Sequence, residues 1–385
     1  ALDDLIVRLR VGEPWQADDR TLLWLIGQRS GEEIGPEALA ELCRIAREGN
    51  FAKAGEMSHN KKDKPEPLFR VALEQGHYLA WQGRQTPRGD ALHKLGSLAW
   101  NGRAIFEANC DAVDILLGKD LPDWLIASAM LFVRSAIKHE PSTAARWMEA
   151  IAKSTPITLA SEYGRQSLVA LDAVAPEQGR AVLLALLHGD DPGMSALAAA
   201  LIVARSFDMA DWDHERAQIL SGPDEWRAGG AQVVVEEIKE DCDEPQLCEL
   251  IVKFFDDPAE LVRDRAADVF RRISTAAMGR YADLYQAFLS SPYFEGERTY
   301  FMHRLEEAPA ELDEFVLELL ELAVSKLPKA GTARGSIGYR LWEPLMRIYA
   351  SHDGDPAMRK RCLDLVDQLV ANDIGGSDKL SEATR

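Results

Sequence analysis

Residues 256–273 read DDPAELVRDRAADVFRRI, and this stretch decides the fold. Its apolar side chains recur at the spacings i, i+4, i+7, i+8 and i+11, at Val262, Ala266, Val269, Phe270 and Ile273. That spacing places them on one face of a helix. Aspartate suits the position before a helix, and proline suits the first turn, where its missing N–H leaves no bond unmade. The stretch therefore predicts a capped helix with one buried face.

Apolar stripes of the same period recur along the chain, for example at 39–46, 247–255 and 312–327. The alternation typical of strands is nearly absent, because Val233–Val235 continues more naturally into Glu236 and Glu237 as a helix. We predict an all-α protein with helical content above roughly 60% and roughly 16–18 helices joined by short turns.

The aspartate–proline start occurs again at Asp191–Pro192 and at Asp355–Pro356. In each case an apolar residue, a small residue four positions later and then a pair of apolar residues follow, at Ala196, Ala200 and Val203–Ala204 in the first copy. So many short helices with a recurring start are more typical of a stack of helix pairs than of one bundle.

The motif Asp257–Pro258, Leu261–Arg263, Ala266 and Val269–Phe270 resembles the consensus of HEAT repeats. The resemblance implies a right-handed α-solenoid of stacked antiparallel helix pairs. It also implies that Asp257 and Arg263 take part in a structural ladder between repeats rather than bind a ligand. The repeat is visible from residue 176 onward, so we expect an irregular helical region at 1–175 and a HEAT-like region at 176–385.

The C-terminal segments 341–349 and 361–367 resemble the end of bacterial STAND-type ATPases. The helical-repeat tails of those proteins sense a trigger, often in phage defence. No Gly-x₄-Gly-Lys-Ser/Thr loop occurs in this sequence, so the nucleotide-binding part is not expected here. The chain starts at Ala1 without a methionine, and we expect a piece of a longer protein, which could oligomerise through its missing parent.

Composition excludes several classes of function. The formal net charge of −19 makes binding to nucleic acid or to an anionic membrane unexpected. The longest apolar run, about 196–204, is far shorter than the roughly 20 residues of a membrane span. Five widely spaced cysteines lack the pattern of a zinc site and are interpreted as reduced thiols of a cytoplasmic protein, at Cys43, Cys110, Cys242, Cys248 and Cys362.

Patterns of catalysis and metal binding are missing as well. Eight histidines occur without a His-Glu-x-x-His pair, and no Gly-x-Ser-x-Gly elbow appears. Asp241–Glu244 could suggest a cation site, but it lacks the central glycine of an EF-hand and is interpreted as an acidic turn. We therefore expect no catalytic residue, no metal ligand and no cofactor.

Two charged segments are the candidate interaction surfaces. Residues 224–260 have a net charge of −9, which suits a solvated ridge or the docking of a basic partner. Residues 59–103 have a net charge of +4, and within them 81–90 is interpreted as a donor-rich loop. Arginine and tryptophan are enriched at binding hot spots, so Trp81, Arg84 and Arg88 are the candidate partner-binding residues.

The sequence thus favours a non-catalytic, protein-binding helical scaffold, the trigger-sensing C-terminal part of a larger signalling or antiphage-defence ATPase. Two alternatives stay open. One is a HEAT-like enzyme of the DNA glycosylase or pigment lyase type, against which the acidic charge argues. The other is a structural spacer, which would have no surface patch of unusual character.

Overall fold

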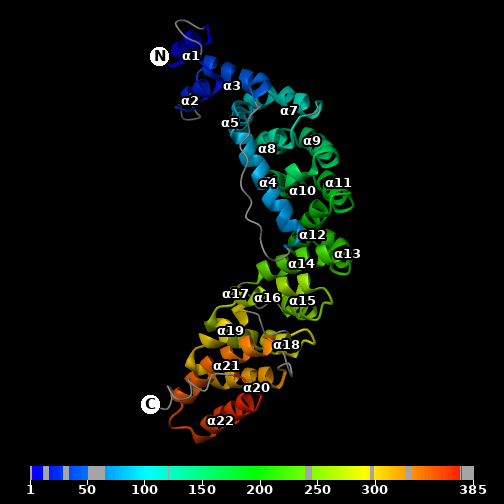
Figure 1. Cartoon of the computed structure of the whole chain (residues 1–385). Helices are drawn as coiled ribbons and strands as arrows, with labels where there is room; N and C mark the ends of the chain where they lie inside the picture. Colours follow the sequence, from blue (N-terminus) through cyan, green and yellow to red (C-terminus); the bar gives the residue numbers. More distant parts are fainter. Residues whose placement is uncertain are drawn as a thin grey trace. The chain divides into compact units, whose positions relative to one another are not determined.

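The structure, a computed structural model, describes residues 2–11, 17–28, 34–50, 66–119, 121–238, 245–294, 299–326, 332–372 and 374 (Figure 1). Of these residues 84% are helical, and no strand occurs among them. The all-α prediction and the helical content are confirmed.

The chain divides into two compact units, unit 1 at Ala1–Arg216 and unit 2 at Ala217–Arg385. Unit 1 contains α1 (Leu2–Val11), α2 (Asp19–Gly27), α3 (Pro36–Glu48), α4 (Leu68–Arg84), α5 (Pro87–Asn101), α6 (Arg103–Glu107), α7 (Cys110–Leu117), α8 (Asp123–His139), α9 (Pro141–Ser154), η1 (Pro156–Ala160), α10 (Glu162–Val174), α11 (Pro176–Leu187), α12 (Pro192–Asp208) and η2 (Ala210–Trp212). Helix α13 (Asp213–Leu220) spans the division.

Unit 2 contains α14 (Asp224–Glu237), α15 (Pro245–Phe255), α16 (Glu260–Ala267), α17 (Val269–Arg272), η3 (Thr275–Tyr281), α18 (Ala282–Ser290), α19 (Thr299–Glu306), η4 (Ala310–Leu312), α20 (Asp313–Lys326), α21 (Thr332–Ser351) and α22 (Pro356–Ala371). The division follows packing density, whereas the predicted boundary at 175/176 follows the regularity of the repeat. That regularity stays a prediction.

The described residues form 22 α-helices, more than the roughly 16–18 that the stripes predicted. The reason is that single stripes run through two short helices. The stripe at 260–273 is divided between α16 and α17 by Asp268, and residues 103–117 are divided between α6 and α7. The apolar face nevertheless stays continuous, since Val262, Ala266 and Phe270 are all buried.

Helices in unit 1 stack as antiparallel neighbours. Helix α8 packs against α5, α9 and α10, and α11 packs against α9, α10 and α12. Helix α4 departs from this pattern, because it lies across α8, η1 and α12 on the side away from α9 and α11 (Figure 1).

Glycines permit this crossing. A Cβ atom at Gly76 would lie 2.5 Å from the backbone nitrogen of Ser161, and one at Gly83 would overlap the Trp124 carbonyl and the Ser128 hydroxyl. The helix backbone can therefore approach η1 and α8 only where no side chain intervenes. In α5, a Cβ at Gly96 would lie 2.6 Å from the backbone nitrogen of Phe132 in α8.

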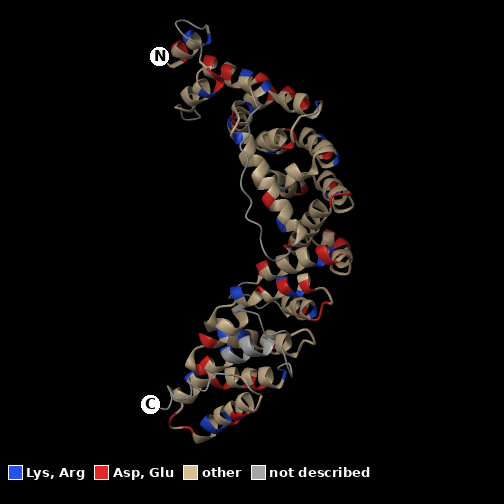
Figure 2. Ribbon diagram, in the orientation of Figure 1, with Lys and Arg blue, Asp and Glu red and all other residues tan. Residues whose placement is uncertain are grey.

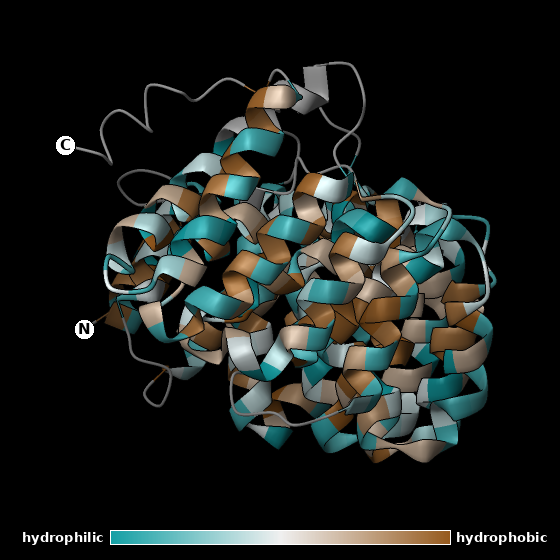
Figure 3. Ribbon diagram, turned by 90° about the horizontal axis from the view of Figure 1, so that it is seen from below, coloured by the Kyte–Doolittle hydropathy of each residue, from teal (hydrophilic) through white to brown (hydrophobic). Residues whose placement is uncertain are grey.

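Both units pack aromatic rings in their interiors, around Phe106, Phe132 and Trp147 in unit 1 and around Phe270 in unit 2. The ring of Phe270 lies 4.8 Å from that of Tyr285, 4.9 Å from Phe288 and 5.1 Å from Phe301, measured between centroids. Such pairs bury large apolar areas and prefer tilted contacts. Within single helices, apolar and polar residues alternate around the axis, so each helix turns its apolar stripe toward its neighbours (Figure 3).

Arginine–carboxylate pairs join helices about one repeat apart. Arg205 in α12 donates to Asp172 in α10 at 2.9 Å, and Arg347 in α21 pairs with Asp313 in α20 at 2.7 Å. Arg227 in α14 holds the Asp257 carboxylate with two bonds of 2.8 Å.

The second residue assigned to the ladder, Arg263, lies beside Asp257 but bonds to its backbone. Its guanidinium donates to the carbonyls of Asp257 and Pro258 at 2.7 and 2.8 Å and lies over the ring of Tyr293. The carboxylate of Asp257 accepts hydrogen bonds from Arg227 and from the N–H of Ala259.

Candidate functional site

Residues 81–90, expected to form a loop, instead connect two helices by a tight turn. Helix α4 ends at Arg84 and α5 begins at Pro87. Thr86 caps α5, because its hydroxyl accepts the N–H of Gly89 at 3.2 Å and donates to the Gly83 carbonyl at 2.8 Å. A threonine followed by proline is a typical helix start, so the prediction of a loop was wrong.

The expectation of an exposed Arg88 is also wrong. Its residue exposure is 5%, and its Nε donates to the Ala46 carbonyl at the end of α3, at 3.1 Å. Burial lowers the pKa of its guanidinium. Because Arg88 lies in the first turn of α5, its side chain points toward α3 and ties the two helices together.

Trp81 and Arg84 differ in their surroundings. The Trp81 ring is half-buried and stacks on Tyr78 of the same helix, with centroids 6.0 Å apart. Arg84 is exposed, and within the part of the chain that the structure describes it makes no hydrogen bond or ion pair.

Arg84 lines a hollow of about 320 Å³ between α2 and the α4–α5 turn. Two further cations, Arg20 and Lys94, line the same hollow together with Trp24. The Trp24 side chain is 63% exposed, which is unusual for a tryptophan.

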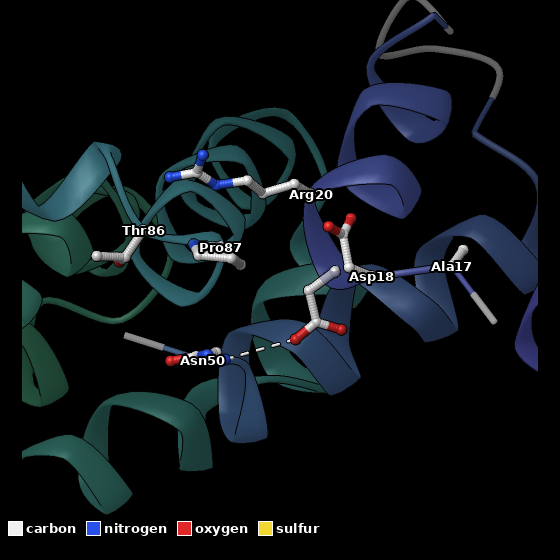
Figure 4. Close-up of a pocket in the computed structure, with 7 residues that line it drawn as sticks. Ala17, Asp18, Arg20, Asn50, Thr86 and Pro87 are labelled. Carbon is white, nitrogen blue, oxygen red and sulfur yellow. Dashed lines mark hydrogen bonds between the residues drawn. The ribbon is translucent and has the colours of Figure 1, made fainter. Parts of the chain in front are cut away.

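A second hollow, of about 610 Å³, adjoins the first and is lined by Ala17, Asp18, Asp19, Arg20, Asn50, Thr86 and Pro87 (Figure 4). The two hollows share Arg20, Thr86 and Pro87. We name the combined depression the α2–α5 hollow. Figure 4 shows Arg20 reaching from α2 toward the side on which Thr86 and Pro87 lie.

Most charged groups around the α2–α5 hollow are engaged within the protein. Asp18 accepts the N–H of Thr21 at 2.8 Å, and this bond lowers its pKa. Asp19 pairs with Arg44 at 2.6 Å and accepts the N–H of Asn50 at 3.4 Å (Figure 4).

The cations are engaged to different degrees. Arg20 donates to the Gln85 carbonyl at 2.9 Å, and Lys94 pairs with Asp90 at 3.0 Å. Arg84 and Trp24 have no such hydrogen bond or ion pair among the described residues, so they are the groups in the hollow that can take up a ligand.

A serine, a histidine and an aspartate lie together in unit 2, but not in the geometry of a catalytic triad. The Ser351 hydroxyl lies 3.0 Å from both the Asp313 carboxylate and Nδ1 of His352, and that same Nδ1 lies 3.5 Å from Asp313. A relay needs the serine and the aspartate on opposite ring nitrogens. Asp313 also pairs with Arg347, so the cluster joins α20 to α21.

The acidic segment 224–260 is partly engaged in structure. Asp224 and Asp257 both pair with Arg227, while Glu236 and Glu249 are exposed and Glu225 and Glu237 are half-buried. Figure 2 colours the acidic and basic residues along the ribbon. Asp241–Glu244, Cys242 and the lysines at 61, 62 and 64 fall outside the described residues. Among the residues that are described, no group of three metal-ligating side chains comes together.

Sequence reasoning did not single out Arg20 and Trp24, and it counted Lys94 only as one cation of the basic segment 59–103. A signal existed for Trp24, because the buried stripe of α2 runs through Leu22, Leu25 and Ile26 and leaves the indole on the outer side. Arg20 and Lys94 could not be placed beside Arg84, since 64 and 10 residues of chain separate them from it.

No helix in the described ranges is long and apolar enough to cross a membrane. No protein-family model matches the chain, and no curated protein matches it.

Among solved structures, Kap121p bound to RanGTP aligns with 95% of this chain at 11% identity and a TM-score of 0.37. The chain spans about half, 53%, of that protein's length. The Pds5–Scc1 complex aligns with 96% of this chain and 72% of its own, at 12% identity and a TM-score of 0.37. Because these overlaps are weak, the assignment of a helical stack rests on the helices and contacts of this chain itself.

Proposed function

We propose that this protein is a protein-binding helical scaffold that contacts its partner through the α2–α5 hollow. The observation that carries the proposal is the exposed Arg84, which has no hydrogen bond or ion pair among the described residues and lies beside the exposed Trp24. Arginine and tryptophan are among the residue types enriched at interface hot spots.

The partner expected at this surface is a protein rather than a nucleic acid. Phosphate backbones need a broad basic face, whereas the hollow has three cations in a chain of net charge −19. A hollow of a few hundred Å³ accepts one or two side chains of a partner, and a polar rim around such an anchor is typical of protein interfaces.

The test compares Arg84→Glu and Trp24→Ala with Arg103→Glu in a capture assay from lysate of the source organism, read by mass spectrometry. Arg103 is an exposed arginine of unit 1 that pairs with Glu107 at 2.7 Å and with no other acid among the described residues. We expect both hollow variants to lose the captured protein and the control to keep it, with unfolding free energies of all three within about 1 kcal/mol of wild type. Equal capture of the protein by all three variants would contradict the proposal that the partner binds at the α2–α5 hollow.

The finer part of the proposal is that the protein senses a trigger for a larger signalling or antiphage-defence ATPase. It rests on the resemblance of 341–349 and 361–367, which lie in α21 and α22. Sequencing the complete reading frame tests it, because we expect a Gly-x₄-Gly-Lys-Ser/Thr loop elsewhere in the gene product. A complete frame without such a loop would contradict the ATPase connection and leave the scaffold role in place.

A further inference from the structure

Resting on the proposed function, we propose that the partner group held at Arg84 is an anionic side chain, a carboxylate or a phosphorylated residue in a protein segment. Trp24 then contacts the apolar flank of that segment. The ligand class follows from which groups in the hollow are already bonded and which are not.

Three helices bring their cations to one place. Arg20 comes from α2, Arg84 from α4 and Lys94 from α5. Asp90 is the single acid among the residues that line this part of the hollow, and it is paired with Lys94. This part of the hollow is therefore net positive, while Asp18 and Asp19, which line the other part, are bonded to the Thr21 N–H and to Arg44. A planar guanidinium is suited to two parallel bonds with carboxylate or phosphate oxygens.

Arg84 also borders a small cavity behind the hollow, between α4, α5, α8 and α10. The volume of this cavity is about 20 Å³, so it holds no more than a water molecule. Its polar lining consists of His77, Arg84, His93, Ser128, Glu162 and Tyr163. The ring of His93 lies 5.6 Å from that of Tyr163.

His93 reports on the charge at Arg84. Burial lowers the pKa of His93 first, and the positive charge of Arg84 lowers it further. Lys94 acts in the same direction as Arg84, whereas Asp90 and Glu162 act against it. An anion bound at Arg84 would offset the arginine charge and raise the pKa of His93.

Proton uptake and anion binding must then favour one another. Below about pH 6.5, the ordinary pKa of histidine, the bound state carries more charge on His93 than the free state. Affinity for an anionic segment should therefore rise as pH falls, and it should rise less in Arg84→Gln.

The experiment uses the full chain labelled with ¹³C in its histidine rings, with the His93 signal identified by its loss in His93→Gln. Three short peptides serve as probes: one with a run of glutamates beside a tryptophan, its phosphoserine counterpart, and a neutral glutamine counterpart. We expect one or both acidic peptides to raise the pKa of His93 and the neutral peptide to leave it unchanged. Arg84→Gln should weaken acidic-peptide binding at least about tenfold, and Arg103→Gln should not.

The two acidic peptides distinguish carboxylate from phosphate as the preferred group. Equal binding of the neutral peptide would overturn the proposal, as would binding of the acidic peptides with no change at His93. If neither acidic peptide binds while Arg84→Glu still loses the captured protein, the ligand class is wrong and the proposed function stands. If capture is unaffected as well, both are wrong.

Discussion

Unit 1 and unit 2 are both stacks of short helices with buried aromatic rings, and unit 1 adds close backbone contacts between helices at glycine. In unit 1, α4 and α5 meet their neighbours backbone to backbone at Gly76, Gly83 and Gly96. In unit 2, an aromatic cluster around Phe270 and Tyr285 fills the space between helices. Close backbone contact leaves no room for adjustment, whereas side chains can repack, so the same architecture should respond differently to substitution in its two halves.

The difference also bears on function. In unit 1, α4 crosses three other elements and then turns sharply into α5, and this turn places Arg84 against α2. The α2–α5 hollow and the small cavity that Arg84 also borders both lie in unit 1. We therefore treat unit 1 as the binding unit and expect its glycine contacts to position the α2–α5 hollow.

The largest effects should come from side chains forced into these interiors. Gly96→Leu would place carbon atoms on the backbone of α8, and Ala266→Arg would bury an unpaired charge at a position with no exposure. Each should cost on the order of 4 kcal/mol or more, the first in unit 1 and the second in unit 2.

Hydrogen exchange followed by mass spectrometry separates the two units. We expect Gly96→Leu to remove protection from peptides of unit 1 and Ala266→Arg to remove it from those of unit 2. Gly354→Ala is the matched control, because nothing lies within 4 Å of the added carbon. If both variants keep the wild-type exchange pattern, the assigned helix contacts are wrong.

The buried arginine–carboxylate pairs should contribute about equally to the free energy of unfolding in the two units. The carboxylate in each of the Arg205–Asp172 and Arg227–Asp257 pairs is almost fully buried. Removal of that acid leaves the largely buried guanidinium with only an exposed acidic partner, Asp208 for Arg205 and Asp224 for Arg227. We expect Asp172→Ala and Asp257→Ala each to cost about 3 kcal/mol in denaturant unfolding. Glu321→Ala, which breaks a half-exposed pair with Arg361, should cost less than about 1 kcal/mol. Equal costs for all three would contradict the role of burial.

Tyr285→Phe should stabilise unit 2 or leave it unchanged. The Tyr285 hydroxyl is buried and finds no hydrogen-bond partner among the described residues, and burial raises its pKa. Removing an unsatisfied hydroxyl should change the unfolding free energy by roughly 0 to +1 kcal/mol. A clear loss of stability would show that the hydroxyl is bonded in the folded protein.

The smallest effect should be a pH dependence confined to unit 1. The pKa of His93 is lower in the folded protein than in the unfolded chain, so the unfolded chain binds a proton first as the pH falls. Stability should therefore decrease as the pH drops through about 6.5, and His93→Gln should remove that part of the decrease. Parallel melting curves of wild type and His93→Gln between neutral and mildly acidic pH would contradict this assignment.

The sequence predicted the elements of both units better than their contacts. Period and caps identify the helices, and Asp191 and Asp355 accept the first N–H groups of α12 and α22 as expected. The crossing of α4 was not predictable from the sequence, where Gly76 and Gly83 count only as weak helix formers. Their role is the close contact with η1 and α8, which only the structure shows.

Of the three candidate partner-binding residues only Arg84 lines the proposed hollow, and a role of any of the three in binding stays a prediction. Arg84 lies in the α2–α5 hollow, whereas Arg88 is buried against α3 and Trp81 stacks on its own helix. A cluster of glycine, proline and arginine was interpreted as a loop, but threonine and proline together start a helix at that position. Because α5 begins at Pro87, Arg88 lies in its first turn and is buried, whereas Arg84 at the end of α4 faces the solvent.

Photocrosslinking at Trp24 tests the central claim most directly. A benzophenone amino acid replaces Trp24 in the full chain, and in a second protein it replaces Tyr300, an exposed aromatic residue of unit 2. Both are irradiated in lysate of the source organism. We predict a protein adduct from position 24 that diminishes when Arg84→Glu is added, and no comparable adduct from position 300. An adduct from position 300 alone, or one from position 24 that is indifferent to Arg84, would contradict the assignment of binding to the α2–α5 hollow of unit 1.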